Sequence, residues 1–294
     1  MPSGICHRTY MEIIRTVEKL REAVSSARAA GKTIGLVPTM GALHAGHRSL
    51  VDRARRENDI VVVSVFVNPT QFNNPDDLRT YPRTEEADAA ILADAGVDYA
   101  FMPTAEEVYP EPDTREFDLG PVAAVMEGAM RPGHFNGVAQ IVSKLFAWAQ
   151  PTRAYFGEKD FQQIAVIRRM AELEGFDLDI VSCPIVREAD GLALSSRNVR
   201  LNEQARAIAP KIREVLLASV DLKAQGYEAD ETARLTTDAI NNIDGLEAEY
   251  FQIVDARTMQ PVSRWSDAGD LGTVGCATVY CGGVRLIDNI TYPA

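Results

Sequence analysis

The chain is poor in cysteine and has no long apolar run, and these two shortages exclude several classes of protein. Its 294 residues include four cysteines without CxxC spacing: Cys6, Cys183, Cys276 and Cys281. Scattered cysteines predict reduced thiols and argue against a disulfide or zinc framework. No segment approaches the ~18 apolar residues of a membrane span. Charged side chains within residues 8–19 also argue against a signal peptide, so we expect a cytoplasmic protein.

Positive charge is scarce as well. Thirty Lys and Arg residues stand against 42 Asp and Glu residues, a net charge of −12. An acidic chain is a poor partner for nucleic acid or for an anionic membrane surface, and we expect neither. If the ligands are anions, basic groups must gather where they bind. The candidate groups are Arg131 with His134, Lys159, and Arg197 with Arg200.

Up to residue 187, strand-like and helical segments alternate. Strands are expected at residues 33–37, 59–68, 98–102, 153–156 and 178–186, and helices at 11–30, 46–57, 84–95, 138–149 and 161–173. This alternation predicts an α/β fold, a Rossmann-like parallel sheet with helices on both faces. Ligands of such sheets bind beyond the carboxyl ends of the strands.

The pattern changes after residue 187. Helices are expected at 202–224 and 229–241, followed by strands at 248–254, 274–280 and 284–286. Pro210 falls inside the first helix and predicts a kink or a later start. Helices followed by strands indicate a smaller α+β domain. We therefore predict two domains, 1–187 and 188–294.

The segment PTMGALHAGH, residues 38–47, places two of the four histidines between a predicted strand and a predicted helix. His47 begins the inward face of the helix, and His44 lies in the turn before it. A helix N-terminus attracts phosphate, and imidazoles beside it can donate hydrogen bonds to phosphate oxygens. The alternative is a glycine-rich turn whose histidines only cap or pack. A Walker A loop is disfavoured, because His47 and Arg48 stand where that loop has Lys and Ser or Thr.

Four further polar segments are expected at the ends of predicted strands. FVNPTQF, residues 66–72, offers the amides of Asn68 and Gln71, unless these are solvated groups in a proline turn. FGEKD, residues 156–160, carries Lys159, which can contact a nucleotide, although a loop lysine is often simply solvated.

In the same region, Asp160 and Gln163 have the spacing of a capping box, which is a structural alternative.

DGLALSSRN, residues 190–198, can surround phosphate with two hydroxyl groups and Arg197, although turn chemistry also explains this segment. MRPGHFNGV, residues 130–138, reads equally well as an exposed turn, and Arg131 and His134 are not assigned to the site.

These motifs resemble one family in order and spacing. PTMGALHAGH contains the HxGH signature of the nucleotidyltransferase superfamily. Together with FVNPTQF, YPRT (81–84), RPGHFNGV, YFGEKDFQQ (155–163) and DGLALSSRN, it resembles the pantothenate synthetase (pantoate–β-alanine ligase) family over residues 33–200. Leu194 and Gln140 depart from the family pattern, which often has Met at the first position and a small or hydroxylated residue at the second.

The resemblance implies an ATP-dependent ligase of coenzyme A biosynthesis. Pantoate and β-alanine would be joined through pantoyl adenylate, with release of AMP and pyrophosphate. His47, with His44 beside it, would stabilise phosphate charge and act as acid to the leaving group. Gln71 and Gln163 would hold pantoate, with Gln71 also near β-alanine. The expected ATP site comprises Met40, Gly41, Ala42, Leu43, His44, Ala45, Gly46, His47, Gly157, Glu158, Lys159, Asp160, Val186, Leu194, Ser195, Ser196 and Arg197.

The same resemblance implies Mg²⁺ arriving with ATP, a homodimer, and a C-terminal domain that acts as a lid over a nucleotide-binding first domain. Val186, at the end of a predicted strand, would contact the adenine through its backbone. Two other functions remain open at this point: a different HxGH transferase that acts on a phosphate ester, and a nucleotide-binding regulator without catalysis. The uncharged pair Gln71 and Gln163 favours a small hydroxy acid over a phosphate ester.

Overall fold

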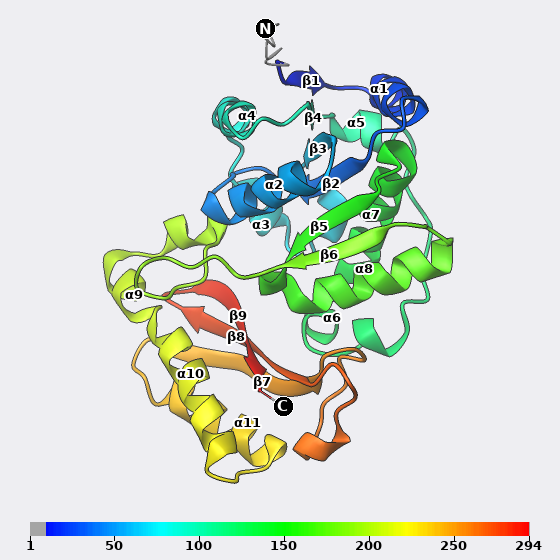
Figure 1. Cartoon of the computed structure of the whole chain (residues 1–294). Helices are drawn as coiled ribbons and strands as arrows, with labels where there is room; N and C mark the ends of the chain where they lie inside the picture. Colours follow the sequence, from blue (N-terminus) through cyan, green and yellow to red (C-terminus); the bar gives the residue numbers. More distant parts are fainter. Residues whose placement is uncertain (1–9, 294) are drawn as a thin grey trace, which may run out of the picture.

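Two sheets organise residues 10–293, the part of the chain that the computed structural model describes (Figure 1). The first sheet is parallel, with strands in the order β1 (Glu12–Ile14), β4 (Tyr99–Phe101), β3 (Ile60–Val65), β2 (Ile34–Thr39), β5 (Arg153–Gly157) and β6 (Asp179–Cys183). The second is antiparallel, in the order β7 (Leu246–Asp255), β8 (Thr273–Cys281) and β9 (Val284–Tyr292). The second sheet lies below the first in Figure 1, near the ends of β5 and β6, and the two sheets agree with the predicted fold class.

The central strands are β2 and β3, and their sequences explain that position. Nearly all of their side chains are buried, as expected for apolar strands covered on both faces. Their register pairs Ile34 with Ile60 and Thr39 with Val65. Because both strands end together, the polar segments that follow them emerge at one edge of the sheet.

Helices cover both faces of the first sheet. On one face, α1 (Val17–Ala29), α7 (His134–Ala149) and α8 (Phe161–Glu174) share a core with the strands. On the other, α2 (Ala45–Glu57) and α4 (Glu85–Asp94) pack on Val37, Val61 and Val63. The predicted doubly covered parallel sheet is confirmed.

Several predicted boundaries are wrong: β9 runs to Tyr292, six residues beyond the predicted end of the last strand, and β3 ends at Val65, three residues before the predicted end. Residues 12–14 form the edge strand β1 and not the start of a helix, which begins only after Thr16 caps the N–H of Lys19. Helix α7 begins at His134, four residues earlier than expected. Strand β6 ends at Cys183, so Val186 lies beyond the strand.

The second sheet carries its own core. Its helices are α9 (Glu203–Ile208), α10 (Lys211–Ala224) and α11 (Ala229–Asn241). The predicted interruption at Pro210 is confirmed, because α9 ends before it and α10 starts after it. A smaller cluster, which includes Met126, Ala165 and Cys276, joins the second sheet to helix α8 and to the segment before α6. The division at residue 187 stays a prediction.

Short helical turns connect these elements and carry several of the predicted site residues. They are η1 (Pro69–Gln71), α3 (Pro75–Thr80), α5 (Ala105–Val108), η2 (Gly120–Ala123), α6 (Glu127–Met130), η3 (Glu158–Asp160), η4 (Ser196–Arg200) and η5 (Trp265–Asp267). Within residues 10–293 no helix combines the length and the apolar character needed to cross a membrane. Cys183, Cys276 and Cys281 are free and buried, whereas Cys6 lies outside the described residues.

Candidate active site

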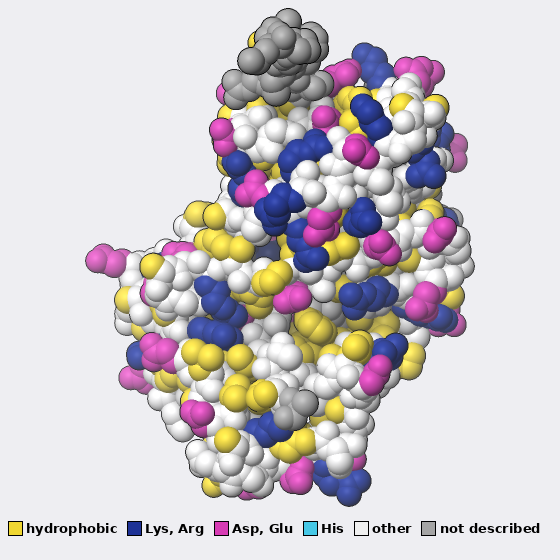
Figure 2. All heavy atoms as spheres, viewed as in Figure 1, with side chains coloured by type: hydrophobic (Ala, Val, Ile, Leu, Met, Phe, Trp, Pro, Cys, Tyr) yellow, Lys and Arg dark blue, Asp and Glu magenta, His cyan; other side chains and the backbone are white. Residues whose placement is uncertain are grey.

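One cleft at the carboxyl edge of the parallel sheet collects most of the predicted site residues. Its lining includes Met40, His44, Gly46, His47, Gln71, Gly157, Lys159, Asp160, Gln163, Val186, Leu194, Ser195, Ser196 and Arg197. On the molecular face shown in Figure 2, basic and acidic side chains are interspersed. Inside the cleft, Lys159 and Arg197 supply the positive charge that an anionic ligand requires.

Both histidines cap helix α2 and also face the cleft. His44 is the N-cap, and its Nδ1 accepts a hydrogen bond from the N–H of Gly46 (3.1 Å). The Nδ1 of His47 accepts from the N–H of His44 (3.3 Å), and the two ring centroids lie 4.2 Å apart. Capping and function are therefore compatible readings of this motif. Because each Nδ1 is an acceptor, a neutral ring carries its proton on Nε2.

The two rings are neutral at pH 7. Burial, followed by the neighbouring His44, lowers the pKa of His47 from 6.5 to about 3. Burial and the charge of Lys159 also lower the pKa of His44. The free protein thus presents N–H donors here and does not hold an imidazolium ready to act as an acid.

The turn before the histidines is fixed from beneath by Asp88, which the sequence analysis did not identify. This carboxylate is 1% exposed and accepts hydrogen bonds from the N–H groups of Ala42 (3.0 Å) and Leu43 (2.8 Å). Those two groups are therefore already occupied. Five predicted ATP-binding residues do not line the cleft: Gly41, Ala42, Leu43, Ala45 and Glu158. The sequence did offer one clue to Asp88: it lies on the same inward side of helix α4 as the buried Leu92, where an acidic residue is unusual.

Asn68 and Gln71 form an ordered pair of amides. Asn68 is 1% exposed, and its Nδ2 donates to the carbonyl oxygen of Gly137 (3.1 Å) and to Oε1 of Gln71 (3.1 Å). A carbonyl can only accept, so this contact fixes the orientation of both amides. Gln71 consequently directs its Nε2 at Met40 in the cleft. The alternative of solvated amides is wrong for Asn68.

Lys159 and Asp160 enter the cleft from η3. The Nζ of Lys159 lies 3.6 Å from Oδ2 of Asp160. Asp160 precedes helix α8 without a capping hydrogen bond from its side chain, so the capping-box interpretation is wrong. The side chains of Asp160 and Gln163 are therefore not needed to cap helix α8.

Arg197, which lines the cleft on the segment after Leu194, is held by Asp77, another residue that was not predicted from the sequence. The Nη2 of Arg197 lies 2.9 Å from Oδ2 of Asp77, and Nη1 of Arg200 lies 3.0 Å from Oδ1. Burial opposes ionisation, but the charge of Arg197 holds the pKa of Asp77 below its ordinary value. An incoming phosphate would therefore compete with this carboxylate for the guanidinium.

The backbone of Val186 is partly occupied. Its carbonyl oxygen accepts a hydrogen bond from the N–H of Leu194 (3.0 Å), which closes the loop of residues 187–193 just before Ser195 and Ser196. The hydroxyl of Ser196 lies 3.3 Å from that of Tyr81, a cleft residue within the YPRT motif. The segment that carries the two serines is thus held near both Val186 and Tyr81.

The chain is similar to a known family over nearly its whole length. The family model for pantoate-beta-alanine ligase matches residues 12–291. A pantothenate synthetase of Porphyromonas gingivalis is 61% identical over 282 residues, which are 96% of this chain and 99% of the relative. A pantothenate synthetase of Bacteroides fragilis is 57% identical over 282 residues, with the same coverage of both chains.

Solved structures agree with this result. A crystal structure of pantothenate synthetase from Thermus thermophilus has a TM-score of 0.89 and 47% identity, covering 96% of this chain and 100% of the other. A pantoate-beta-alanine ligase from Francisella tularensis, complexed with beta-gamma ATP and beta-alanine, has a TM-score of 0.78 and 35% identity. That match covers 96% of this chain and 97% of the other.

Proposed function

This chain belongs to the pantoate–β-alanine ligase family, and we propose that the cleft described above is where it joins pantoate to β-alanine with ATP. The enzyme is an AMP-forming amide ligase that makes pantothenate. The main support for this location is that neutral imidazole donors, oriented amides and two cations meet in one cleft.

The reaction needs no nucleophile from the protein. The pantoate carboxylate attacks the α-phosphorus of ATP, and the bond to pyrophosphate breaks. The amine of β-alanine then attacks the acyl carbon of pantoyl adenylate, losing a proton as AMP leaves. Catalysis therefore consists of positioning and of stabilising charge on phosphate.

His47 and His44 act in this scheme as donors of hydrogen bonds. Each Nδ1 already accepts a backbone N–H, so each Nε2–H is available to a phosphate oxygen. A pKa of about 3 for His47 disfavours the acid role that the family resemblance implied, because the free enzyme holds almost no protonated ring at pH 7. Donation to developing charge requires no proton transfer from the ring.

Gln71 and Gln163 hold pantoate in this proposal. The fixed orientation of Gln71 makes it a donor toward the cleft, which suits a carboxylate or a hydroxyl oxygen. Lys159 and Arg197 bind the phosphates of ATP. Asp160 is the one carboxylate among the described residues that line the cleft, so Mg²⁺ would be held mainly by ATP phosphates and water.

We further propose a cytoplasmic homodimer, as the family resemblance implies. The free thiols of Cys183, Cys276 and Cys281 suit a reducing compartment. Sedimentation equilibrium of the purified protein tests the dimer. A single species with the mass of one chain would contradict it.

Pyrophosphate release tests the reaction itself. The enzyme is supplied with ATP, Mg²⁺ and pantoate, with and without β-alanine. We expect pyrophosphate to depend on pantoate, and pantothenate with AMP to appear only when β-alanine is present. Pyrophosphate release that is indifferent to pantoate would contradict the assignment.

A further inference from the structure

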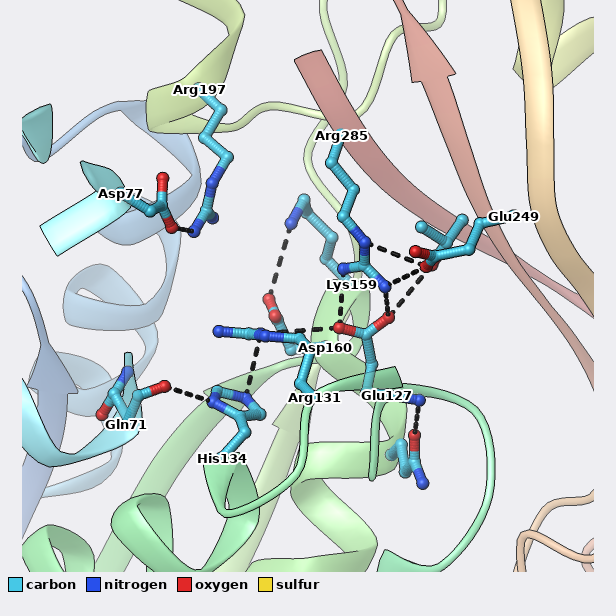
Figure 3. Close-up of polar contacts among 12 residues, drawn as sticks. Gln71, Asp77, Glu127, Arg131, His134, Lys159, Asp160, Arg197, Glu249 and Arg285 are labelled. Carbon is cyan, nitrogen blue, oxygen red and sulfur yellow. Dashed lines mark hydrogen bonds and ion pairs between the residues drawn. The ribbon is translucent and has the colours of Figure 1, made fainter. Parts of the chain in front are cut away.

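Glu127, the first residue of the short helix α6, contacts side chains from all three strands of the second sheet, and Figure 3 shows its pair with Arg285. Its Oε1 accepts hydrogen bonds from the hydroxyls of Tyr250 on β7 (2.7 Å) and Thr278 on β8 (3.0 Å). Arg285 on β9 binds both carboxylate oxygens, at 2.8 Å and 2.6 Å. One carboxylate of the first domain therefore connects to every strand of the second sheet.

This contact is ionic and largely dry. The side chain of Glu127 is 12% exposed and that of Arg285 is 22% exposed. Burial opposes ionisation, but Arg285 lowers the pKa of Glu127 to about 2. Charge-assisted, bidentate pairs of this kind are among the stronger and more directional polar contacts in proteins.

The same carboxylate also faces the first domain. Nη1 of Arg131 lies 3.5 Å from Oε2 of Glu127 and 3.1 Å from Nε2 of His134. The Nδ1 of His134 lies 2.8 Å from the backbone carbonyl oxygen of Gln71. Figure 3 shows these side chains in a row from Glu127 to Gln71.

The direction of each hydrogen bond in this row is determined by its ends. A guanidinium can only donate, so Nε2 of His134 accepts from Arg131; a backbone carbonyl can only accept, so Nδ1 donates to Gln71. Burial, with the charge of Arg131, lowers the pKa of His134 to about 4, so the ring is neutral and carries one proton. A neutral imidazole in this tautomer satisfies both contacts.

The backbone near Gln71 rests on the helix that begins with His134. A Cβ added to Gly137 would lie 2.3 Å from the carbonyl oxygen of Thr70, so the two backbones are in close contact. Asn68 closes the same junction by donating to the carbonyl oxygen of Gly137 (3.1 Å). A shift of His134 would therefore move the turn that carries Gln71.

We propose that Glu127 is a positioning residue for Gln71. Glu127 contacts the second sheet, and through Arg131 and His134 it also determines the position of Gln71, the amide that holds pantoate. The affinity for pantoate then depends on an interdomain contact outside the cleft. The inference rests on the proposed role of Gln71 in binding pantoate.

The ATP side of the cleft has a separate attachment. The Nδ2 of Asn289 on β9 donates to the backbone carbonyl oxygens of Glu158 (2.7 Å) and Lys159 (3.2 Å). Removing the charge of Glu127 leaves this attachment in place. Loss of the Glu127 contact is thus expected to affect pantoate more than ATP.

The test compares Glu127→Gln with Glu249→Gln. Glu249 also pairs with Arg285 and is 19% exposed, but among the described contacts it reaches Gln71 only indirectly, through Arg285 and Glu127. We expect Glu127→Gln to raise the KM for pantoate roughly tenfold, the scale of a hydrogen bond to a charged group, with the KM for ATP changed by less than about twofold. Glu249→Gln should change neither constant by more than about twofold.

A second pair of variants tests the contact between His134 and Gln71 without altering the contacts of Glu127 with the second sheet. In His134→Asn, Nδ2 stands near the position of Nδ1 and can still donate to Gln71, whereas His134→Leu removes the donor. The asparagine variant keeps the donor to Gln71 but loses Nε2, the atom that accepts from Arg131. We expect the KM for pantoate to rise about fivefold in the leucine variant and less, about twofold, in the asparagine variant.

Gln71→Ala separates failure of this inference from failure of the proposed site. If Gln71→Ala leaves the KM for pantoate unchanged, the proposed pantoate site is wrong. If Gln71→Ala raises that KM but Glu127→Gln raises it no more than Glu249→Gln, or raises the KM for ATP equally, Glu127 is only structural and the inference is overturned.

Discussion

The two walls of the cleft hold their polar groups in different ways. At the histidine wall, Asp88 fixes the backbone and the capping contacts fix the rings, so the donors are already oriented. At the wall that carries Arg197, the guanidinium is bound to Asp77 of the protein itself. The histidine donors are thus already oriented before a ligand binds, whereas Arg197 must release the carboxylate of Asp77 before it can bind a phosphate. The contrast indicates that catalysis and nucleotide affinity can be altered separately.

The strongest test of the histidine wall is removal of a ring. We expect His47→Ala to lower the rate of pantoate-dependent pyrophosphate release by about 10²–10³-fold, the scale of losing one oxyanion donor. In His47→Gln, Nε2 can still donate near the position of the lost Nε2–H, so this variant should keep clearly more activity. Equal loss in both variants would instead support proton donation by His47.

Asp88→Asn tests whether the wall depends on its buried support. The amide can accept at only one atom, which weakens one of the two contacts to the N–H groups of Ala42 and Leu43. We expect the free energy of unfolding to fall by about 2 kcal/mol and the adenylation rate to fall with it. Asp52→Asn, which alters an exposed pair with Arg48, is the control and should cost less than about 1 kcal/mol.

Acid should weaken the fold through the buried histidines. The pKa falls from 6.5 to about 3 for His47 and to about 4 for His134. Below pH 6.5 the unfolded chain binds protons that the folded chain does not, so stability is complete above pH 6.5 and declines as the pH falls toward 4. Each ring contributes at most about 1.4 kcal/mol per pH unit.

Urea unfolding at pH 7, 6 and 5 measures this slope. His47→Gln removes one of the titrating rings and should make the slope shallower. An unchanged slope would show that the ring is not buried as described. Glu127, whose pKa is lowered from 4.5 to about 2, adds its own loss of stability only below about pH 4.5.

The smallest expected effect is at the pair of Arg197 and Asp77. Asp77→Asn removes the anion that competes for Arg197, and we expect the KM for ATP to fall by about twofold to fivefold. Asp76→Asn, at an exposed neighbouring position, is the control. A higher KM for ATP in Asp77→Asn would mean that the carboxylate orients Arg197 and does not compete for it.

Short-range patterns predicted most of the fold and the cleft. Apolar runs located β2 and β3, and the polar motifs at strand ends identified His44, His47, Gln71 and Lys159 as neighbours. The edge strand β1 was missed because three residues carry too little periodicity.

The supporting acids could not be predicted in the same way. Asp88 lies 45 residues from its partner Leu43, Asp77 lies 120 residues from Arg197, and Glu127 lies 158 residues from Arg285. Local spacing carries no information about such pairs, because only the folded topology brings them together. The residues that do the chemistry have recognisable motifs, whereas those that hold them in place do not.

The close contact between Gly137 and Thr70 has a consequence for the choice of substrate. The separation of α7 from the turn Pro69–Gln71 is determined by two backbones, with no side chain between them that could be shortened. Redesign of the enzyme for a bulkier hydroxy acid therefore cannot gain room by moving α7 and this turn apart. Space would have to come from shortening side chains that line the cleft, such as Val142 and Gln163.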